Sequence, residues 1–304
     1  LTTLSESPLQ FGLIYTGSDD GLVHVTKNGG GSWELVSTSL PKDLWVSRVT
    51  ASKFKKERVY ASLNGYRWDD FTPYVYASDD YGKTWKSISA GLPASPVNVL
   101  KEDTENENIL YAGTDNGLYV SFDRGGSWNA FSKGLPNVAV HDLVLQPEAK
   151  DLVVGTHGRS IYRTNVSALQ QLTDAIKNKT LHIFDVEEVK HSPRWGSTWS
   201  KWLDAFAPET EFRVYAASAG KMDVKILAEN GAELNRFEVN ADAGFNYIPY
   251  NLTITDTGKA NWLKKDKTVS LNPASNSMLY LPKGKYTLEI TGNGATEKKA
   301  FEVK

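Results

Sequence analysis

One eight-residue pattern occurs three times in the first half of the chain, at residues 26–33, 78–85 and 121–128. Each copy reads Ser/Thr-x-Asp/Asn-x-Gly-x-Ser/Thr-Trp, and short runs with alternating apolar residues separate the copies. A repeat of roughly 40–50 residues that is built from short strands is typical of β-propeller blades. The first half of the chain is therefore predicted to consist of such blades.

The pattern predicts a self-capped hairpin. Its Asp or Asn can accept hydrogen bonds from the N–H groups of a tight turn, its Gly can adopt a left-handed conformation, and its Trp can bury a ring beneath the turn. The pattern is similar to the Asp-box, or BNR repeat, of sialidases, sortilin-type receptors and two-propeller xyloglucan-cleaving enzymes, where it is mostly scaffold. The residues expected to have this structural role are Asn28, Gly30, Trp33, Asp80, Gly82, Trp85, Asp123, Gly125 and Trp128.

Aligning the copies predicts four blades over residues 1–166, three of them full and the fourth lacking its Asp-box and outer strand. Closed propellers usually have four to eight four-stranded blades. We therefore expect an arc of a larger propeller. Its neighbours would be upstream blades of a longer parent chain, or a second copy.

The second half of the sequence has a different character. Residues 167–180 have apolar positions at a helical spacing and are expected to form a linker helix. Residues 181–304 contain about seven short strand-like runs separated by turn signals, which predicts an immunoglobulin- or fibronectin-like β-sandwich. Residues 256–280 are expected to be an insertion with little structure of its own.

Charge and composition exclude several classes of protein. The chain has 34 basic and 36 acidic residues in 304, and this balance does not favour nucleic acid or an anionic membrane as a partner. The absence of cysteine excludes disulfides and a thiol nucleophile. The five histidines lack the paired spacing of a transition-metal site, no apolar run is long enough to span a membrane, and no cofactor is expected.

Four further runs extend the resemblance over most of the chain. They are Asp-Asp-Phe-Thr-Pro-Tyr at 69–74, Gly-Leu-Tyr-Val-Ser at 117–121, Val-His-Asp-Leu-Val at 140–144 and Gly-Thr-His-Gly-Arg at 155–159. With these runs the chain resembles the C-terminal part of secreted bacterial BNR/Asp-box propeller proteins of the sortilin-type, glycosyl-hydrolase-like group. The resemblance implies a secreted, periplasmic or cell-surface location. It also implies a parent protein several times longer.

The turn between the second and third strands of each blade is expected to lie opposite the Asp-box hairpin, so that four turns share one face. Loops placed by a rigid scaffold commonly carry function. The ligand-binding candidates on these turns are Tyr66, Arg67, Trp68, Asp69, Asp70, Asp19, Asp20, Asp115, His157 and Arg159. For His157 and Arg159 the alternative is a structural role, through turn hydrogen bonds or an ion pair with Asp142 or Asp115.

The long second-blade turn, residues 64–70, is the strongest of these candidates. Its two rings and its Arg could stack on or hydrogen-bond to a sugar. Asp69 and Asp70 could serve acid–base chemistry or hold Ca²⁺, the alternative being that they solvate and cap the loop. Adjacent carboxylates are poorly placed to flank a glycosidic bond, since the pair should lie about 5–9 Å apart across it.

Three functions remain open from the sequence. The first is a module that binds a glycan or a protein without catalysis of its own. The second is part of a glycoside hydrolase, similar to the two-propeller xyloglucanases, whose remaining catalytic residues lie upstream. The third is a purely structural module.

Overall fold

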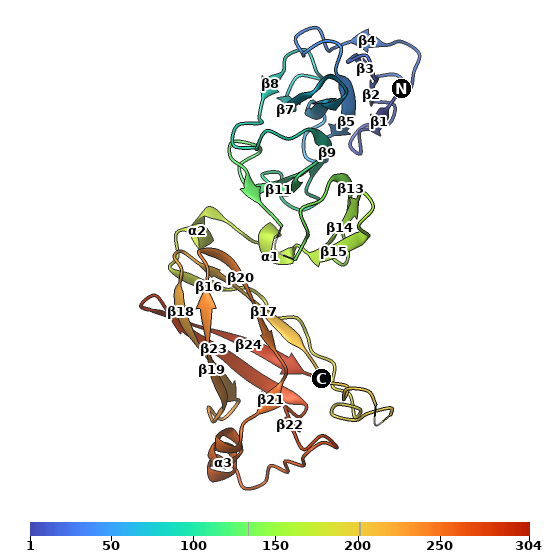
Figure 1. Cartoon of the computed structure of the whole chain (residues 1–304). Coiled ribbons are helices and arrows are strands. Elements are labelled where there is room, and N and C mark those ends of the chain that lie inside the picture. Colours follow the sequence, from blue (N-terminus) through green and yellow to red (C-terminus); the bar gives the residue numbers. More distant parts are fainter. Residues whose placement is uncertain (133, 201) are drawn as a thin grey trace. The chain divides into compact units, whose positions relative to one another are not determined.

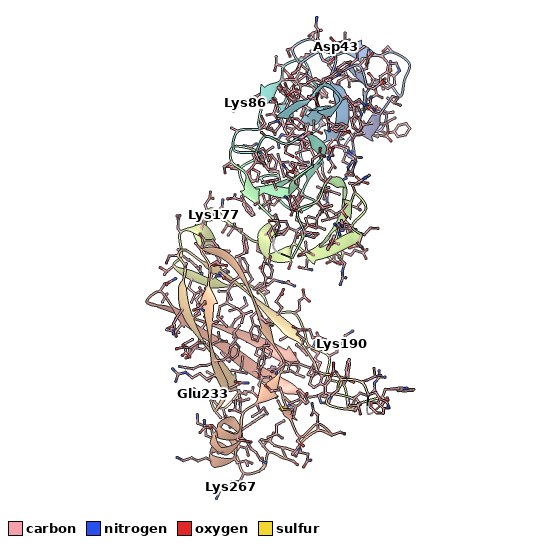
Figure 2. All side chains as sticks on the ribbon, viewed as in Figure 1. Asp43, Lys86, Lys177, Lys190, Glu233 and Lys267 are labelled. Atoms are coloured by element: carbon pink, nitrogen blue, oxygen red, sulfur yellow. The ribbon has the colours of Figure 1, made fainter. Side chains whose placement is uncertain are left out.

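The computed structural model describes residues 1–132, 134–200 and 202–304 (Figure 1). The chain is all-β and divides into two compact units, Leu1–Gln170 and Gln171–Lys304. Each unit has its own hydrophobic core, and Figure 2 shows all described side chains on the ribbon. Within the described residues, no helix is both long and apolar enough to cross a membrane.

The first unit is built of antiparallel sheets in which each strand pairs with the next one along the chain, as in propeller blades. Three sheets have four strands, and the fourth sheet has three among the described residues. The strands of the first two sheets are β1 (Thr3–Glu6), β2 (Ile14–Gly17), β3 (Val23–Thr26) and β4 (Glu34–Leu35), then β5 (Trp45–Ala51), β6 (Val59–Gly65), β7 (Asp70–Ser78) and β8 (Lys86–Ser87). Those of the other two are β9 (Val97–Glu102), β10 (Leu110–Thr114), β11 (Gly117–Ser121) and β12 (Asn129–Ala130), then β13 (Val140–Gln146), β14 (Asp151–Thr156) and β15 (Ile161–Asn165).

Successive blades pack side by side through their first strands, because β1 contacts β5, β5 contacts β9 and β9 contacts β13. Apolar side chains fill the space between blades. Tyr15 and Val23 of the first blade share one cluster with Val49 of the second, and Tyr60 of the second blade shares another with Leu100 of the third. The core of this unit therefore lies between the sheets.

The second unit contains two antiparallel sheets with one core between them. Phe212 and Phe301 meet across the core with ring centroids 5.7 Å apart. The sheet orders are β16-β17-β20 and β19-β18-β23-β24, with β16 (Leu181–Ile183), β17 (Thr210–Ala216), β18 (Gly220–Ala228), β19 (Glu233–Ala241), β20 (Gly244–Tyr250), β23 (Gly284–Gly292) and β24 (Ala295–Val303). A short pair, β21 (Thr253–Ile254) and β22 (Leu279–Tyr280), completes the unit.

Residues 256–280 were expected to have little structure of their own, and this expectation is wrong for their first part and for β22 at their end. Helix α3 (Asp256–Lys265) begins where the Thr255 hydroxyl oxygen accepts a hydrogen bond from Gly258 N–H at 3.0 Å, and it ends in two lysines that favour a helix C-terminus. Gly258 allows the helix to approach β19, since a Cβ there would lie 1.9 Å from the Leu234 carbonyl oxygen. Contact with the sheet thus stabilises a helix whose sequence is only weakly amphipathic.

The predicted linker, residues 167–180, contains two single-turn helices in place of one longer helix. Helix α1 (Ser167–Gln170) belongs to the first unit, where Ala168 and Leu169 are buried. Helix α2 (Asp174–Lys177) belongs to the second unit and is capped by Thr173, whose hydroxyl accepts from Ile176 N–H.

Candidate ligand-binding face

The polar residues of each Asp-box are held by hydrogen bonds within the box itself. In the second box, the Asp80 carboxylate accepts from Thr84 N–H at 2.9 Å and from the Thr84 hydroxyl at 2.6 Å, while the Ser78 hydroxyl accepts from Gly82 N–H at 2.8 Å. Burial alone would raise the pKa of Asp80, but these hydrogen bonds outweigh it and the pKa is lowered. The polar part of the box is therefore engaged in the turn.

The tryptophans of the later boxes link neighbouring blades. Trp85 Nε1 donates to the Val36 carbonyl of the first blade, and Trp128 Nε1 donates to the Ile88 carbonyl of the second, both at 2.7 Å. Each acceptor directly follows the fourth strand of the preceding blade. Trp33 of the first box is 46% exposed, and its Nε1 has no hydrogen-bond partner among the described residues.

On the candidate face, the second-blade turn is the longest of the four. It leaves β6 at Gly65, forms a short 3₁₀ helix over Tyr66–Trp68 and enters β7 at Asp70. Gly65 and Asp70 pair across the base, where a Cβ on Gly65 would lie 2.7 Å from the Asp70 Cβ. Asp69 closes the turn in the left-handed conformation, with φ of 56°, and its N–H bonds to the Tyr66 carbonyl.

A line of side-chain hydrogen bonds fixes the base of this turn to the third blade. Buried Asn64 accepts from Tyr66 N–H at 2.9 Å and donates to Asn98 Oδ1 at 2.9 Å. Asn98, also buried, then donates to Asp115 Oδ1 at 2.8 Å. Hydrogen-bonded networks of buried polar side chains restrict the arrangements available to them, so this network holds the base of the turn in place.

Above this base, aromatic side chains are exposed to solvent. The exposed fractions are 59% for Tyr66 and 72% for Trp68. The Arg67 guanidinium lies 5.4 Å from the ring centroid of Trp45, at the start of β5, which is a cation–π distance. Exposed rings on a fixed turn form a surface that can stack on a ligand.

The two carboxylates of the turn differ in their surroundings. Asp70 accepts from Thr72 N–H at 2.9 Å and from the Tyr74 hydroxyl at 2.7 Å, and these bonds hold its pKa below the usual value. Asp70 is thus ionised and engaged at neutral pH, which does not suit a general acid. Asp69 is exposed. Among the described residues, no group of three or more His, Asp or Glu side chains is arranged to hold a metal ion.

The structure joins some of the other candidates to their own blades. Asp20 accepts from the Ser18 hydroxyl, which lowers the pKa of its carboxyl, and from Leu22 N–H at 3.3 Å, while neighbouring Asp19 is exposed. The rings of His157 and His141 lie 5.3 Å apart. Within the described part of the chain, no hydrogen bond or ion pair joins these side chains to the second-blade turn.

Arg159 does not form the ion pair that was considered for it. Asp142 instead pairs with Arg48 of the second blade, with Nη2 and Oδ1 at 2.7 Å, and Asp115 accepts from Asn98. The Arg159 side chain is exposed. Charge alone could not choose between Arg48 and Arg159 as the partner of Asp142, because the choice depends on how the blades curve.

Asn98 is the residue of this face that sequence analysis missed. The signal available was an amide side chain inside an otherwise apolar strand, Val97-Asn98-Val99-Leu100. A buried amide needs partners, and Asn98 finds them in two different blades.

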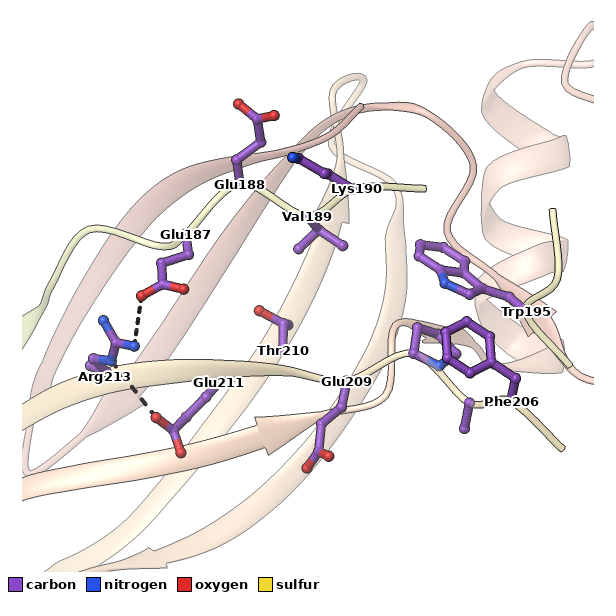
Figure 3. Close-up of a pocket in the computed structure, with 12 residues that line it drawn as sticks. Glu187, Glu188, Val189, Lys190, Trp195, Phe206, Glu209, Thr210, Glu211 and Arg213 are labelled. Atoms are coloured by element: carbon purple, nitrogen blue, oxygen red, sulfur yellow. Dashed lines mark hydrogen bonds and ion pairs between the residues drawn. The ribbon is translucent and has the colours of Figure 1, made fainter. Parts of the chain in front are cut away.

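The second unit has a hollow of its own, of about 680 Å³, that the sequence did not indicate (Figure 3). Acidic side chains are prominent around it, but the Arg213 guanidinium lies 2.8 Å from the Glu187 carboxylate and 3.7 Å from that of Glu211. The rings of Trp195 and Phe206 line the other end of the hollow. Glu188, which also lines the hollow, lies 2.6 Å from Lys304 Nζ, so three of its carboxylates are already paired within the unit.

Comparison with known proteins identifies no family for this chain. No family model matches the sequence, and no curated protein does. Among solved structures, the chain is similar to a GH74 xyloglucanase from Xanthomonas campestris, with 12% identity, a TM-score of 0.45 and coverage of 99% of this chain and 47% of that one. It is similar to YCF48 bound to D1 peptide, with 13% identity, a TM-score of 0.39 and coverage of 71% and 62%.

A third similar structure is PorZ, a bacterial surface component of the type-IX secretion system of Porphyromonas gingivalis, with 12% identity, a TM-score of 0.38 and coverage of 96% of this chain and 37% of that one. The chain therefore spans less than two thirds of the length of each of these three proteins. The description of the sheets as blades rests on the strand order and packing of this chain.

Proposed function

We propose that this chain is a binding module of a propeller protein, and that its ligand, a glycan or a protein segment, stacks on the second-blade turn. The observation that carries the proposal is the pair of exposed rings, Tyr66 and Trp68, on a turn whose base is fixed by Asn64 and Asn98. Aromatic rings on a rigid support supply contact area with little loss of side-chain freedom.

Binding is favoured over catalysis because the turn lacks a competent acid. A glycosidase needs one carboxyl that remains protonated and a second carboxylate across the bond. The hydrogen bonds of Asp70 keep it ionised, and Asp69 is its neighbour on the same loop. The alternative is part of a glycoside hydrolase whose other acid lies outside this chain, and a purely structural module is the second alternative.

Several finer points belong to the same proposal. The two-sheet second unit is interpreted as an immunoglobulin- or fibronectin-like sandwich, and the whole protein as secreted, periplasmic or exposed at the cell surface. A bound Ca²⁺ would need ligands from the partner or substrate in addition to Asp69.

A glycan-array screen of the full chain and of three variants tests the proposal. Replacing the exposed ring in Trp68→Ala should weaken binding by at least about tenfold, equivalent to about 1.4 kcal/mol. Asp70→Ala should weaken it as well, because Asp70 holds the turn through Thr72 and Tyr74. The matched control is Trp199→Ala, which removes a still more exposed ring (94% against 72% for Trp68) from the second unit and should leave binding unchanged.

Equal loss of binding in Trp68→Ala and Trp199→Ala would remove the second-blade turn as the site. Release of reducing sugar from xyloglucan by the unmodified chain would favour the hydrolase alternative. Binding to no glycan would leave a protein segment as the proposed ligand, to be tested with the same variants.

A further inference from the structure

The rear face of each blade, meaning the face that contacts the preceding blade, has the same construction in the second and third blades. Val49 in β5 and Leu100 in β9 occupy the same place in the repeat. Val49 precedes the residue that pairs with buried Tyr60 of β6, and Leu100 precedes the residue that pairs with buried Tyr111 of β10. Their exposed fractions are 2% and 1%. The box tryptophan completes this face by donating to a carbonyl of the preceding blade.

The first blade has the same rear face, and no other described part of the first unit covers it. Leu4 in β1 precedes Ser5, the partner of buried Tyr15, and so corresponds to Val49 and Leu100. Its exposed fraction is 58%, and that of the box tryptophan Trp33 is 46%. Leu4 and Trp33 therefore face solvent at the positions whose equivalents in the later blades are buried against a preceding blade.

The box glycines show the same difference at the backbone. A Cβ on Gly82 would lie 2.9 Å from Val36 of the preceding blade, and one on Gly125 would lie 2.8 Å from Ile88. A Cβ on Gly30 would have only the Trp33 indole nearby, at 3.9 Å. In the later boxes this glycine admits a neighbouring blade, and in the first box the corresponding space is open.

We propose that the rear face of the first blade, with Leu4 and Trp33 at its centre, is a docking surface for another propeller blade that residues 1–304 do not supply. The partner presents a complete four-stranded blade. It offers an apolar face to Leu4 and, directly after its fourth strand, a main-chain carbonyl to Trp33 Nε1. The argument is continuity, because the surface repeats an interface that occurs twice within the chain.

A second copy of this chain does not meet this description. The blade at the other end of the arc is the sheet β13-β14-β15, which has no fourth strand in the described part of the chain. After β15 the chain enters α1 instead. Without a residue that follows a fourth strand, such a copy lacks the carbonyl corresponding to those of Val36 and Ile88.

The absence of cysteine provides a direct test, since a single introduced thiol is unique. In the full chain, the thiol of Leu4→Cys should react rapidly with a maleimide, and that of Val49→Cys, a nearly isosteric change at a buried position, should react slowly. A fusion that repeats residues 42–96 ahead of Leu1 places a copy of the second blade before the first. In that fusion we expect the Leu4→Cys thiol to react at least about tenfold more slowly, because a buried thiol reacts only through local opening.

Val144→Cys is the matched control, since Val144 is 53% exposed in the fourth blade and should react equally fast with and without the added blade. Hydrogen exchange of the added segment reports whether it has folded. An unprotected Leu4→Cys thiol beside a folded added blade overturns the proposal, as does an added blade that stays unfolded against this face. Slowing of the reaction with rising concentration of the unfused chain also overturns it, in favour of a second copy.

Discussion

The first Asp-box and the two that follow it join the same positions by hydrogen bonds but have different surroundings. One bond is reversed, because Asn28 Nδ2 donates to the Ser32 hydroxyl whereas the Ser127 hydroxyl donates to the Asp123 carboxylate. Asn28 accepts from Ser32 N–H at 2.9 Å, as Asp123 does from Ser127 N–H at 2.8 Å. The tryptophans differ, since Trp128 is 8% exposed and bonded to the preceding blade, whereas Trp33 is half exposed. The polar residues thus form the turn locally, and the tryptophan serves the interface between blades.

The largest expected difference is in the free energy of unfolding, between a variant that lacks a box tryptophan buried against the preceding blade and one that lacks the half-exposed tryptophan of the first box. Trp128→Ala should lower the free energy of unfolding by about 3–5 kcal/mol, the usual cost of emptying a buried aromatic site. Trp33→Ala should lower it by about 1 kcal/mol or less, because Trp33 is already half exposed and donates no hydrogen bond to another blade among the described residues. Denaturant unfolding of both variants measures the difference. Equal losses of unfolding free energy in the two variants would contradict the proposed difference between the first box and the later ones.

The box glycines should give a smaller difference of the same sign. Gly30 and Gly125 both have positive φ, at 97° and 86°, so alanine strains the backbone by about 1 kcal/mol at either position. Gly125→Ala in addition forces a methyl group against Ile88, which should add about 1–3 kcal/mol. Thermal unfolding of the two variants compares them, and a Gly30→Ala variant that is the less stable of the two would contradict the account.

The smallest effect is on the dependence of stability on pH. Hydrogen bonds outweigh burial and lower the pKa of Asp80 and Asp123 in the folded state. Their contribution to stability is therefore present above the ordinary pKa of about 3.9 and is lost as pH falls through the lowered values. Asn28 has no such titration.

An Asp80→Asn/Asp123→Asn double variant should accordingly lose less stability than the unmodified chain between pH 5 and pH 2. The first box shows that Asn can take this place, since Asn28 Nδ2 donates to the Ser32 hydroxyl at 3.0 Å. Urea midpoints measured across this range supply the test. Parallel curves for the two proteins would indicate that the boxes do not titrate in this way.

Sequence analysis predicted structure that depends on neighbouring residues more easily than contacts between residues far apart in the sequence. The Ser/Thr, Asp and Gly of each box make their hydrogen bonds within eight residues, so the pattern itself indicates the turn. The exposed rings of the second-blade turn could likewise be anticipated from a polar, glycine-containing stretch. Bonds such as that of Asn64 with Asn98, or of Arg48 with Asp142, join different blades and depend on their spacing and curvature.

Sequence analysis did not predict helix α3, because this helix too depends on contacts with residues distant in the sequence. Its amphipathic pattern is weak, and it contains Gly258, a poor helix former. The helix is stabilised by contact with β19 and by the Trp262 ring beside Tyr286. The local signals of its start were the Thr255 cap and Asp256 in the first turn.

The most direct test of the account is hydrogen exchange of the three box indole N–H groups, followed by NMR and assigned with Trp→Phe variants. Trp85 and Trp128 should exchange slowly, because each donates to a carbonyl of the preceding blade. Trp33 should exchange rapidly, because no blade covers it. A slowly exchanging Trp33, or equally rapid exchange at all three positions, would contradict the claim that these rings mark the interface between blades.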